Sequence, residues 1–333
     1  MQARGYAYVR DRTALLDAAA APLLGLFAEH HLPWEIDRLR EQAEIVPSLA
    51  EMATKAVELL AAKGGEAGFF LLVEGSKIDK AAHPNDAPTH AREALAYDDA
   101  VAALRAFAAR DGRTLLLSTS DHETGGVSLG RGVVTDGEGE EAPLRTRSFA
   151  AEARGELDDD KWYDVGLLAG VSMSSEAMAT EALAEVGEPS AAELAADESL
   201  RRGLTVALAT RLQGAARLGV LARHELGLLV DAVELYGSLG AYGLSRAMGA
   251  VISARAKVGW TTFGHTAVDV NLYATGPGSE LLHGSLDNAE IGQRIASVMG
   301  WDLASLTAAL GTPLISPLDR QDAETANFTR WPH

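Results

Sequence analysis

The protein has 333 residues, of which 29 are Lys or Arg and 47 are Asp or Glu, so its formal net charge is −18 at pH 7. This balance argues against a nucleic-acid-binding protein, because binding to a phosphate backbone requires a basic face. The sequence contains no cysteine, which excludes disulfides, thiolate metal ligands and cysteine nucleophiles. No apolar run reaches the length of about 18 residues that a membrane-spanning helix needs, so we expect no membrane contact.

Helix and strand patterns alternate in the first third of the chain. Residues 47–63 carry apolar side chains at helical spacing, and the short apolar run at 69–73 is typical of a strand covered on both faces. The helical pattern returns at 86–110, and a second buried-strand pattern follows at 114–119. Strand, helix and strand in this order predict a βαβ unit with a parallel sheet.

The composition changes beyond residue 130. Residues 131–160 are acidic and glycine-rich, which indicates a solvated connection. Residues 164–256 form a series of alanine- and leucine-rich helical patterns, and we interpret this stretch as a helical insertion in an α/β domain. An alternating apolar pattern at 267–274 predicts a return to the sheet, and residues 287–309 predict a further helix.

Polar side chains with metal-binding chemistry follow both predicted strands of the βαβ unit, and another precedes the third strand. The carboxyl ends of parallel strands meet at one edge of a sheet, so we expect the first two groups to lie together. Carboxylates with imidazoles suit zinc, whereas carboxylates alone suit magnesium. Six such groups are too many for one tetrahedral ion, which predicts a cluster of ions. The six residues are Glu74, Asp79, His83, Asp121, His122 and His265.

Each of these residues also has a structural interpretation. A histidine near a strand end is more often hydrogen-bonded or exposed than bound to a metal. Asp79 and Asp121 could instead cap a turn or a helix. The glycines of Gly276-Pro277-Gly278 lack the strand-to-helix context of a dinucleotide-binding loop, so we interpret them as a turn.

Three segments resemble the alkaline phosphatase family in residue type, order and spacing. They run from Val73 to His83, from Thr119 to Gly126 (Thr-Ser-Asp-His-Glu-Thr-Gly-Gly), and over Gly264-His265-Thr266. The resemblance extends from about residue 4 to residue 291, and the helical insertion is similar to that of only a subset of bacterial members. It implies a three-layer α/β sandwich with a largely parallel central sheet, incomplete at its amino-terminal side. We therefore divide the chain into an α/β metal-site segment at 1–130, a mostly helical insertion at 131–259 and a return to the α/β core at 260–333.

The resemblance also implies a site with two zinc ions and one magnesium ion. Its activity would be the hydrolysis of phosphate monoesters through a phosphoserine, with two metal ions stabilising the attacking and leaving oxygens. Phosphate monoesters would be the substrates, and family members are often homodimers. The implied roles are magnesium binding for Glu74, first-zinc binding for Asp79, His83 and His265, second-zinc binding for Asp121 and His122, and phosphate binding for Lys80.

The nucleophile of this mechanism has no assigned residue. In the family it is a serine that follows an aspartate, and no aspartate in this sequence is followed directly by serine or threonine. The bridging aspartate and the phosphate-binding arginine are likewise unassigned, and the three carboxylates offset only half of the charge of three divalent ions. We therefore expect the sequence to be a truncated product whose nucleophile lies upstream.

Two other functions remain open. The chain could be a truncated, catalytically silent metal-binding or interaction module. A phosphomutase or sulfatase of the same superfamily is disfavoured, because Asp121-His122-Glu123-Thr124-Gly125-Gly126 and Gly264-His265-Thr266 resemble phosphatase motifs. Substrate preference and cellular location stay unassigned.

Overall fold

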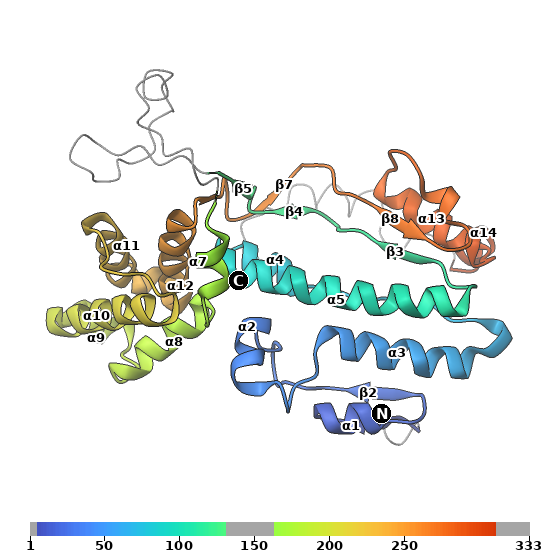
Figure 1. The fold of residues 1–333 in the computed structure, drawn as a ribbon, viewed down its shortest axis with the longest axis horizontal. Helices are drawn as coiled ribbons and strands as arrows, with labels where there is room; N and C mark the ends of the chain where they lie inside the picture. The colour runs from blue at the N-terminus through green and yellow to red at the C-terminus, as the bar shows by residue number, and fades with distance from the viewer. Residues whose placement is uncertain (1–4, 131–162, 311–333) are drawn as a thin grey trace.

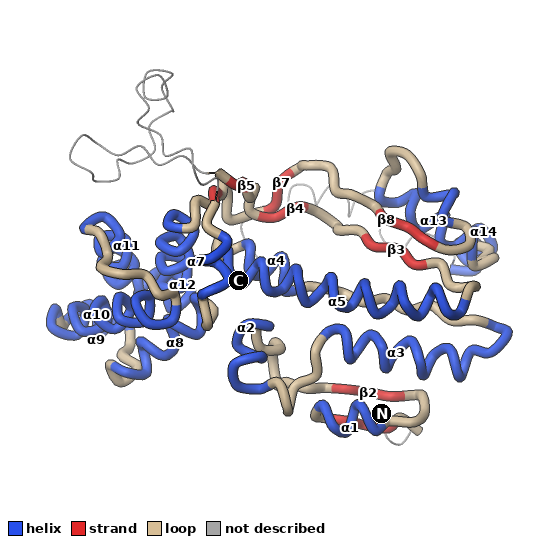
Figure 2. The backbone as a smooth tube through the Cα atoms, in the orientation of Figure 1, coloured by secondary structure: helices blue, strands red, loops and turns tan. Residues whose placement is uncertain are grey.

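The computed structural model describes residues 5–130 and 163–310. The predicted acidic connection at 131–160 and the tail at 311–333 therefore lie outside the described residues. Figure 1 shows the long helix α5 between helix α3 on one side and the ladder of β3 and β8 on the other. Helices α7–α12 gather at one end of the molecule, at the left of Figures 1 and 2.

The amino-terminal part begins with a small parallel ladder and continues into helices. Helix α1 joins the two strands of this ladder, and it contacts α3. The elements are β1 (Ala7–Val9), α1 (Arg12–Asp17), β2 (Leu23–Gly25), α2 (Glu35–Asp37), the π-helical turn Arg38–Gln42, α3 (Leu49–Gly64), the 3-10 turn Gly65–Ala67, α4 (Lys77–Ala82) and α5 (Ala87–Asp111).

Local capping explains where the two long helices begin and end. Ser48 accepts a hydrogen bond from the backbone N–H of Glu51, and the Glu51 carboxylate accepts one from the backbone N–H of Ser48, which forms a capping box at the start of α3. Helix α5 begins after Asp86 and ends before Gly112, whose φ of 70° lies in the left-handed region that favours glycine. The helices predicted at 47–63 and 86–110 are confirmed.

The strand pairing differs from the predicted βαβ unit. Residues 69–73 are extended but form no ladder with another described segment, and β3 (Leu116–Ser118) pairs in antiparallel fashion with β8 (Tyr273–Thr275). Two further antiparallel ladders follow, β4 (Glu123–Thr124) with β7 (His265–Thr266) and β5 (Ser128–Leu129) with β6 (Val258–Gly259). The parallel sheet predicted for this βαβ unit therefore does not form among the described residues.

The burial of residues 69–73 gives the physical reason. Phe69 packs edge-on against Phe107 of α5, with 6.3 Å between ring centroids, whereas Phe70 and Leu72 are 51% and 79% exposed. Exposure thus alternates along the segment, and the face of Phe70 and Leu72 is covered only in part, by an edge-on contact between Phe70 and Trp301 at 5.8 Å between ring centroids. An unbroken apolar run does not distinguish such a segment from one that is covered on both faces.

Residues 164–256 fold into helices with a shared apolar core, as predicted. Met178, Leu208, Leu229 and Met248 are fully buried in one cluster, and each comes from a different helix. The three-part division of the chain stays a prediction. The helices are α7 (Val165–Gly170), α8 (Ser175–Glu185), α9 (Ala191–Ala196), α10 (Glu198–Ala215), α11 (Arg223–Glu234) and α12 (Tyr236–Arg255).

The carboxyl-terminal part returns to the ladders and ends in helices. The strand predicted at 267–274 is shorter than expected, because only its last residues enter β8. The predicted helix at 287–309 is divided in two near Gly300, which has a φ of 66°. The last elements are the 3-10 turn Ser279–Leu282, α13 (Asn288–Val298) and α14 (Leu303–Leu310). None of the helices in the described ranges combines the length and hydropathy that a membrane crossing requires.

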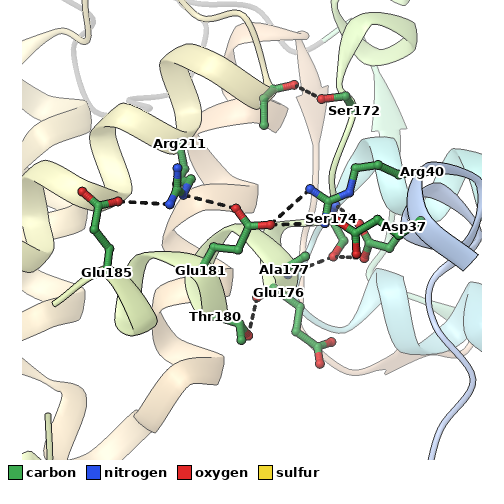
Figure 3. A network of polar contacts seen from close by, with 12 residues as sticks. Asp37, Arg40, Ser172, Ser174, Glu176, Ala177, Thr180, Glu181, Glu185 and Arg211 are labelled. Carbon is green, nitrogen blue, oxygen red and sulfur yellow. Dashed lines mark hydrogen bonds and ion pairs between the residues drawn. The ribbon is translucent and has the colours of Figure 1, made fainter. Parts of the chain in front are cut away.

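A polar network joins the amino-terminal part to helix α8 (Figure 3). The buried Asp37 carboxylate accepts hydrogen bonds from the backbone N–H of Ser174 at 3.0 Å and from its hydroxyl at 2.6 Å. Arg40 forms an ion pair with Glu181 at 3.2 Å, and Glu181 also faces Arg211. Burial raises the pKa of Asp37 above its usual range, although the hydrogen bonds from Ser174 act in the opposite direction.

We expect Leu208→Ala to lower the free energy of unfolding by about 2–5 kcal/mol, because it leaves a cavity in the helical cluster. Val206, which lies on the same helix and is 62% exposed, provides the matched control Val206→Ala. Urea titrations measure both variants. Similar losses of stability in the two would contradict the described core.

The raised pKa of Asp37 predicts a pH dependence of stability. Between about pH 4, where an unfolded aspartate titrates, and its higher folded pKa, the folded state binds more protons than the unfolded state. The contribution of Asp37 to the free energy of unfolding therefore falls as the pH rises through this window. Urea titrations across the window should show that the stability of the wild type minus that of Asp37→Asn decreases with rising pH. A difference that stays constant or increases would contradict the prediction.

Candidate metal centre

The first two side chains of the centre come from helix α4 and its end. Asp79 and His83 are four residues apart and therefore share one face of the helix. His83 Nε2 lies 3.4 Å from Asp79 Oδ1. The carboxylate and the imidazole that the sequence places after residues 69–73 are thus brought together by helical spacing.

The ladder of β4 and β7 brings the other histidines to Asp79. Thr124 pairs with His265 in this ladder, and His122 precedes β4. The rings of His122 and His265 are stacked, with 3.5 Å between their centroids. His265 Nε2 lies 3.4 Å from Asp79 Oδ1, and His122 Nδ1 lies 4.0 Å from the same oxygen. One donor atom from each of Asp79, His122 and His265 lies within 4.8 Å of the others, which is close enough for a shared metal ion.

Hydrogen bonding fixes the tautomer of His83. Its Nδ1 is 2.6 Å from the carbonyl oxygen of Phe263, and because a carbonyl only accepts, Nδ1 carries the proton and donates it. In the neutral ring, Nε2 then presents a lone pair to the carboxylate of Asp79. A histidine that ligates a metal commonly donates its other N–H to a backbone carbonyl in this way.

Thr124 fixes His122 by the same logic. Its hydroxyl donates to Asp79 Oδ1 at 2.6 Å, so the hydroxyl oxygen is left to accept from His122 Nδ1 at 3.2 Å. His122 Nε2 then carries a lone pair, and it lies 3.3 Å from Asp121 Oδ2. With both rings neutral, two places in the centre therefore bring an imidazole lone pair against a carboxylate oxygen, an arrangement that a bound cation stabilises.

The predicted site residues differ in their surroundings. Asp79, His83 and His122 are partly buried and His265 is exposed, yet the four converge. Asp121 contacts His122 but is 80% exposed. Glu74 and Lys80 are exposed, and within residues 5–130 and 163–310 neither forms an ion pair or a side-chain hydrogen bond. The structure thus brings five of the seven predicted residues into contact with one another.

Sequence reasoning gave no role to Glu123, although it lies inside the quoted Asp-His-Glu-Thr-Gly-Gly motif. Its carboxylate accepts hydrogen bonds from the N–H groups of Gly126 and Val127 and from the hydroxyl of Thr266, which ties the turn after β4 to β7. Burial raises the pKa of Glu123, but these hydrogen bonds together lower it by a larger amount. The pKa of Glu123 is therefore below its usual range. Position 125 in the same turn has room only for glycine, because a Cβ there would lie 2.5 Å from the ring of Trp260.

The sequence also gave no role to two other groups of the centre, the Thr124 hydroxyl and the Phe263 carbonyl. The Thr124 hydroxyl lies inside the same motif, so its position beside Asp121 and His122 could have indicated a role in orienting ligands. The Phe263 carbonyl had no such signal, since a backbone acceptor is not encoded by residue type. It lies two residues before His265, and only the folded loop reveals that it meets His83.

A model of the alkaline phosphatase family matches residues 1–201 and 240–301. The chain belongs to the alkaline phosphatase family. It is 31% identical over 335 residues to the alkaline phosphatase of Schizosaccharomyces pombe, a match that covers 98% of this chain and 54% of that protein. The chain spans about half the length of the curated relatives it matches.

Solved alkaline phosphatases have a similar fold. The Thermus thermophilus enzyme matches with a TM-score of 0.68 and 27% identity, over 98% of this chain and 61% of that one. The cold-active enzyme of Shewanella sp. matches with a TM-score of 0.64 and 30% identity, over 90% of this chain and 60% of that one. The expected α/β fold of the alkaline phosphatase type is confirmed. The family implies metal cofactors, and the carboxylate and imidazole donors around Asp79 fit divalent ions.

We expect the chain to bind zinc, and His265→Ala to weaken the affinity by at least about 10-fold, because the variant removes one of the converging donors. Isothermal titration calorimetry with zinc measures the change. His283→Ala is the control, since His283 is also exposed but lies outside the cluster. Equal zinc affinities for the wild type and both variants would contradict the assignment.

Proposed function

We propose that the chain carries the metal-binding part of a phosphatase that hydrolyses phosphate monoesters. The observation that carries this proposal is the convergence of Asp79, His83, His122 and His265, which come from three separate segments, at the motifs that resemble the family. Chance packing is a poor explanation, because the hydrogen bonds that His83 and His122 donate to other groups turn their opposite ring nitrogens toward carboxylates.

The contacts favour a division of the donors between two zinc ions. Asp79, His83 and His265 form one group, because Nε2 of each histidine lies 3.4 Å from Asp79 Oδ1. Asp121 and His122 form the other group, because Nε2 of His122 faces Asp121 while its Nδ1 is engaged by Thr124. When bound, such ions supply positive charge for the oxygens of the transferring phosphoryl group.

The roles of Glu74 and Lys80 are part of the same proposal. Glu74 would hold magnesium, and its exposure leaves the carboxylate accessible to a hydrated ion. Lys80 follows Asp79 on α4 and is exposed, so its flexible ammonium can reach an anionic phosphate. Local positive charge matters here, because the chain has a net charge of −18 and would otherwise repel an anionic substrate.

The proposed phosphoserine step has no nucleophile assigned in this chain. Ser128 stands in the sequence Gly-Val-Ser-Leu-Gly, a pattern that can mark a nucleophile elbow. It lies instead on the exposed strand β5, which pairs with β6, and not on a turn between a strand and a helix. Ser128 is therefore a poor candidate. A homodimer stays a prediction of the resemblance.

The unassigned nucleophile favours a second candidate, a metal-binding module without catalytic activity. Hydrolysis of an aryl phosphate with added zinc and magnesium distinguishes the two candidates. If the chain is an active phosphatase, Asp121→Asn should lower the rate by at least about 10-fold, because it removes a donor from the second group.

Asp231→Asn is the control for this assay, since Asp231 is an exposed aspartate on α11, remote in sequence from the centre. Background rates that are equal in the wild type and in Asp121→Asn would reject the enzyme. If zinc binding persists in that case, the silent module is the supported function.

A further inference from the structure

The corner between α4 and α5 determines how α4 presents its ligands. Residues 84–86 form this corner and are buried, and Asn85 has a φ of 59°, in the left-handed region. The backbone N–H of Asn85 donates to the carbonyl of Ala82 at 2.9 Å, and that of Asp86 donates to the carbonyl of Ala81 at 3.1 Å. The last turn of α4 is thus hydrogen-bonded to the corner, and any movement of the corner moves Asp79 and His83.

The side chain of Asp86 connects this corner to the helical region. Asp86 is 2% exposed, and its carboxylate accepts hydrogen bonds from the backbone N–H and the hydroxyl of Thr89 on α5. It also accepts from the backbone N–H of Ser175 at 2.8 Å and from its hydroxyl at 2.6 Å. Since the Ser175 proton is used, its oxygen accepts from the hydroxyl of Ser245 on α12 at 2.8 Å.

Helix α12 meets the same corner at a second point. The Ser253 hydroxyl donates to the carbonyl of Asn85 at 2.9 Å, and it accepts from the indole N–H of Trp260 at 3.1 Å. A Cβ at Gly249 would lie 3.2 Å from the Asn85 carbonyl, so the helix approaches the corner very closely. Trp260 begins the loop that carries the Phe263 carbonyl and His265. The helical region therefore holds both α4 and this loop.

We propose that Asp86, through Ser175 and Ser245, is a positioning residue for the metal centre. Its hydrogen bonds hold the α4–α5 corner against the helical region, which keeps Asp79 and His83 at their distance from His265 before a metal binds. Affinity gained in this way comes from a donor set that is already arranged when the ion arrives. The proposal rests on the proposed metal-binding function.

The chain contains a matched control in Asp37 and Ser174. Both carboxylates are buried, and each accepts the backbone N–H and the hydroxyl of one of two adjacent serines at the start of α8, with the hydroxyl at 2.6 Å in both cases. Asp37, however, belongs to α2, which carries no residue of the metal centre. Removing either hydroxyl thus breaks a comparable contact to a carboxylate, and only the carboxylate of Asp86 adjoins α4. Each hydroxyl makes one further contact, Ser174 with the backbone N–H of Ala177 in α8 and Ser175 with Ser245.

The test compares Ser175→Ala with Ser174→Ala by zinc calorimetry and by urea unfolding of the metal-free chain. We expect both variants to unfold at lower urea concentrations, because each loses a buried hydrogen bond. Only Ser175→Ala should weaken zinc binding, by about 10-fold, the effect typical of groups that orient metal ligands. Ser245→Ala, which leaves the direct bonds to Asp86 intact, should weaken it less.

Four results would overturn the proposal or the proposed function on which it rests. Wild-type zinc affinity in Ser175→Ala, or an equal loss in Ser174→Ala, would overturn the positioning role. If the wild-type chain itself binds no zinc, the proposed function fails. Amide hydrogen exchange of the metal-free chain then tests the positioning alone, because residues 79–86 should exchange faster in Ser175→Ala than in Ser174→Ala. Equal exchange would overturn it.

Discussion

The centre is organised by the convergence of three imidazoles and a hydroxyl on one carboxylate oxygen. Asp79 Oδ1 accepts the Thr124 hydroxyl, and it also faces nitrogen atoms of three imidazoles. With His83 donating to a backbone carbonyl, its other nitrogen offers a lone pair to an anion. A neutral imidazole that faces a carboxylate in this way needs a cation between the two groups or a proton on its ring, and a divalent ion satisfies several acceptors together. Stability and function are therefore in tension at this point of the fold.

The scaffold offsets this tension with well-paired groups around the site. Glu123 fixes the turn that carries Thr124, and Asp86 fixes the corner that follows His83. Both carboxylates accept hydrogen bonds from backbone N–H groups and hydroxyls, and these neutral donors stabilise the negative charge without an ion-pair partner. The ligand side chains around Asp79 are thus flanked by two carboxylates, Glu123 and Asp86, that accept hydrogen bonds at both of their oxygens. The surrounding acids give rigidity, and the inner acceptors are left available for ligands.

The sequence predicted what depends on periodicity and on motifs. The helices at 47–63 and 86–110 were predicted because caps and glycine stops mark their limits, and the family motifs brought out five residues that the fold places in contact. The pairing of strands was not predictable in the same way, because an apolar run at 69–73 carries no information about its neighbours. The Asp86–Ser175 contact spans 89 positions and joins residue types that ordinarily cap helices, so no local pattern distinguishes it. The Phe263 carbonyl was hidden for a similar reason.

The extended segment at 69–73 has a consequence for handling the protein. Leu72 and the part of Phe70 that Trp301 does not cover leave an apolar strip beside backbone amides that join no ladder among the described residues. Exposed strands of this kind recruit other strands, including those of identical molecules. We therefore expect this strip to favour concentration-dependent self-association of the polypeptide.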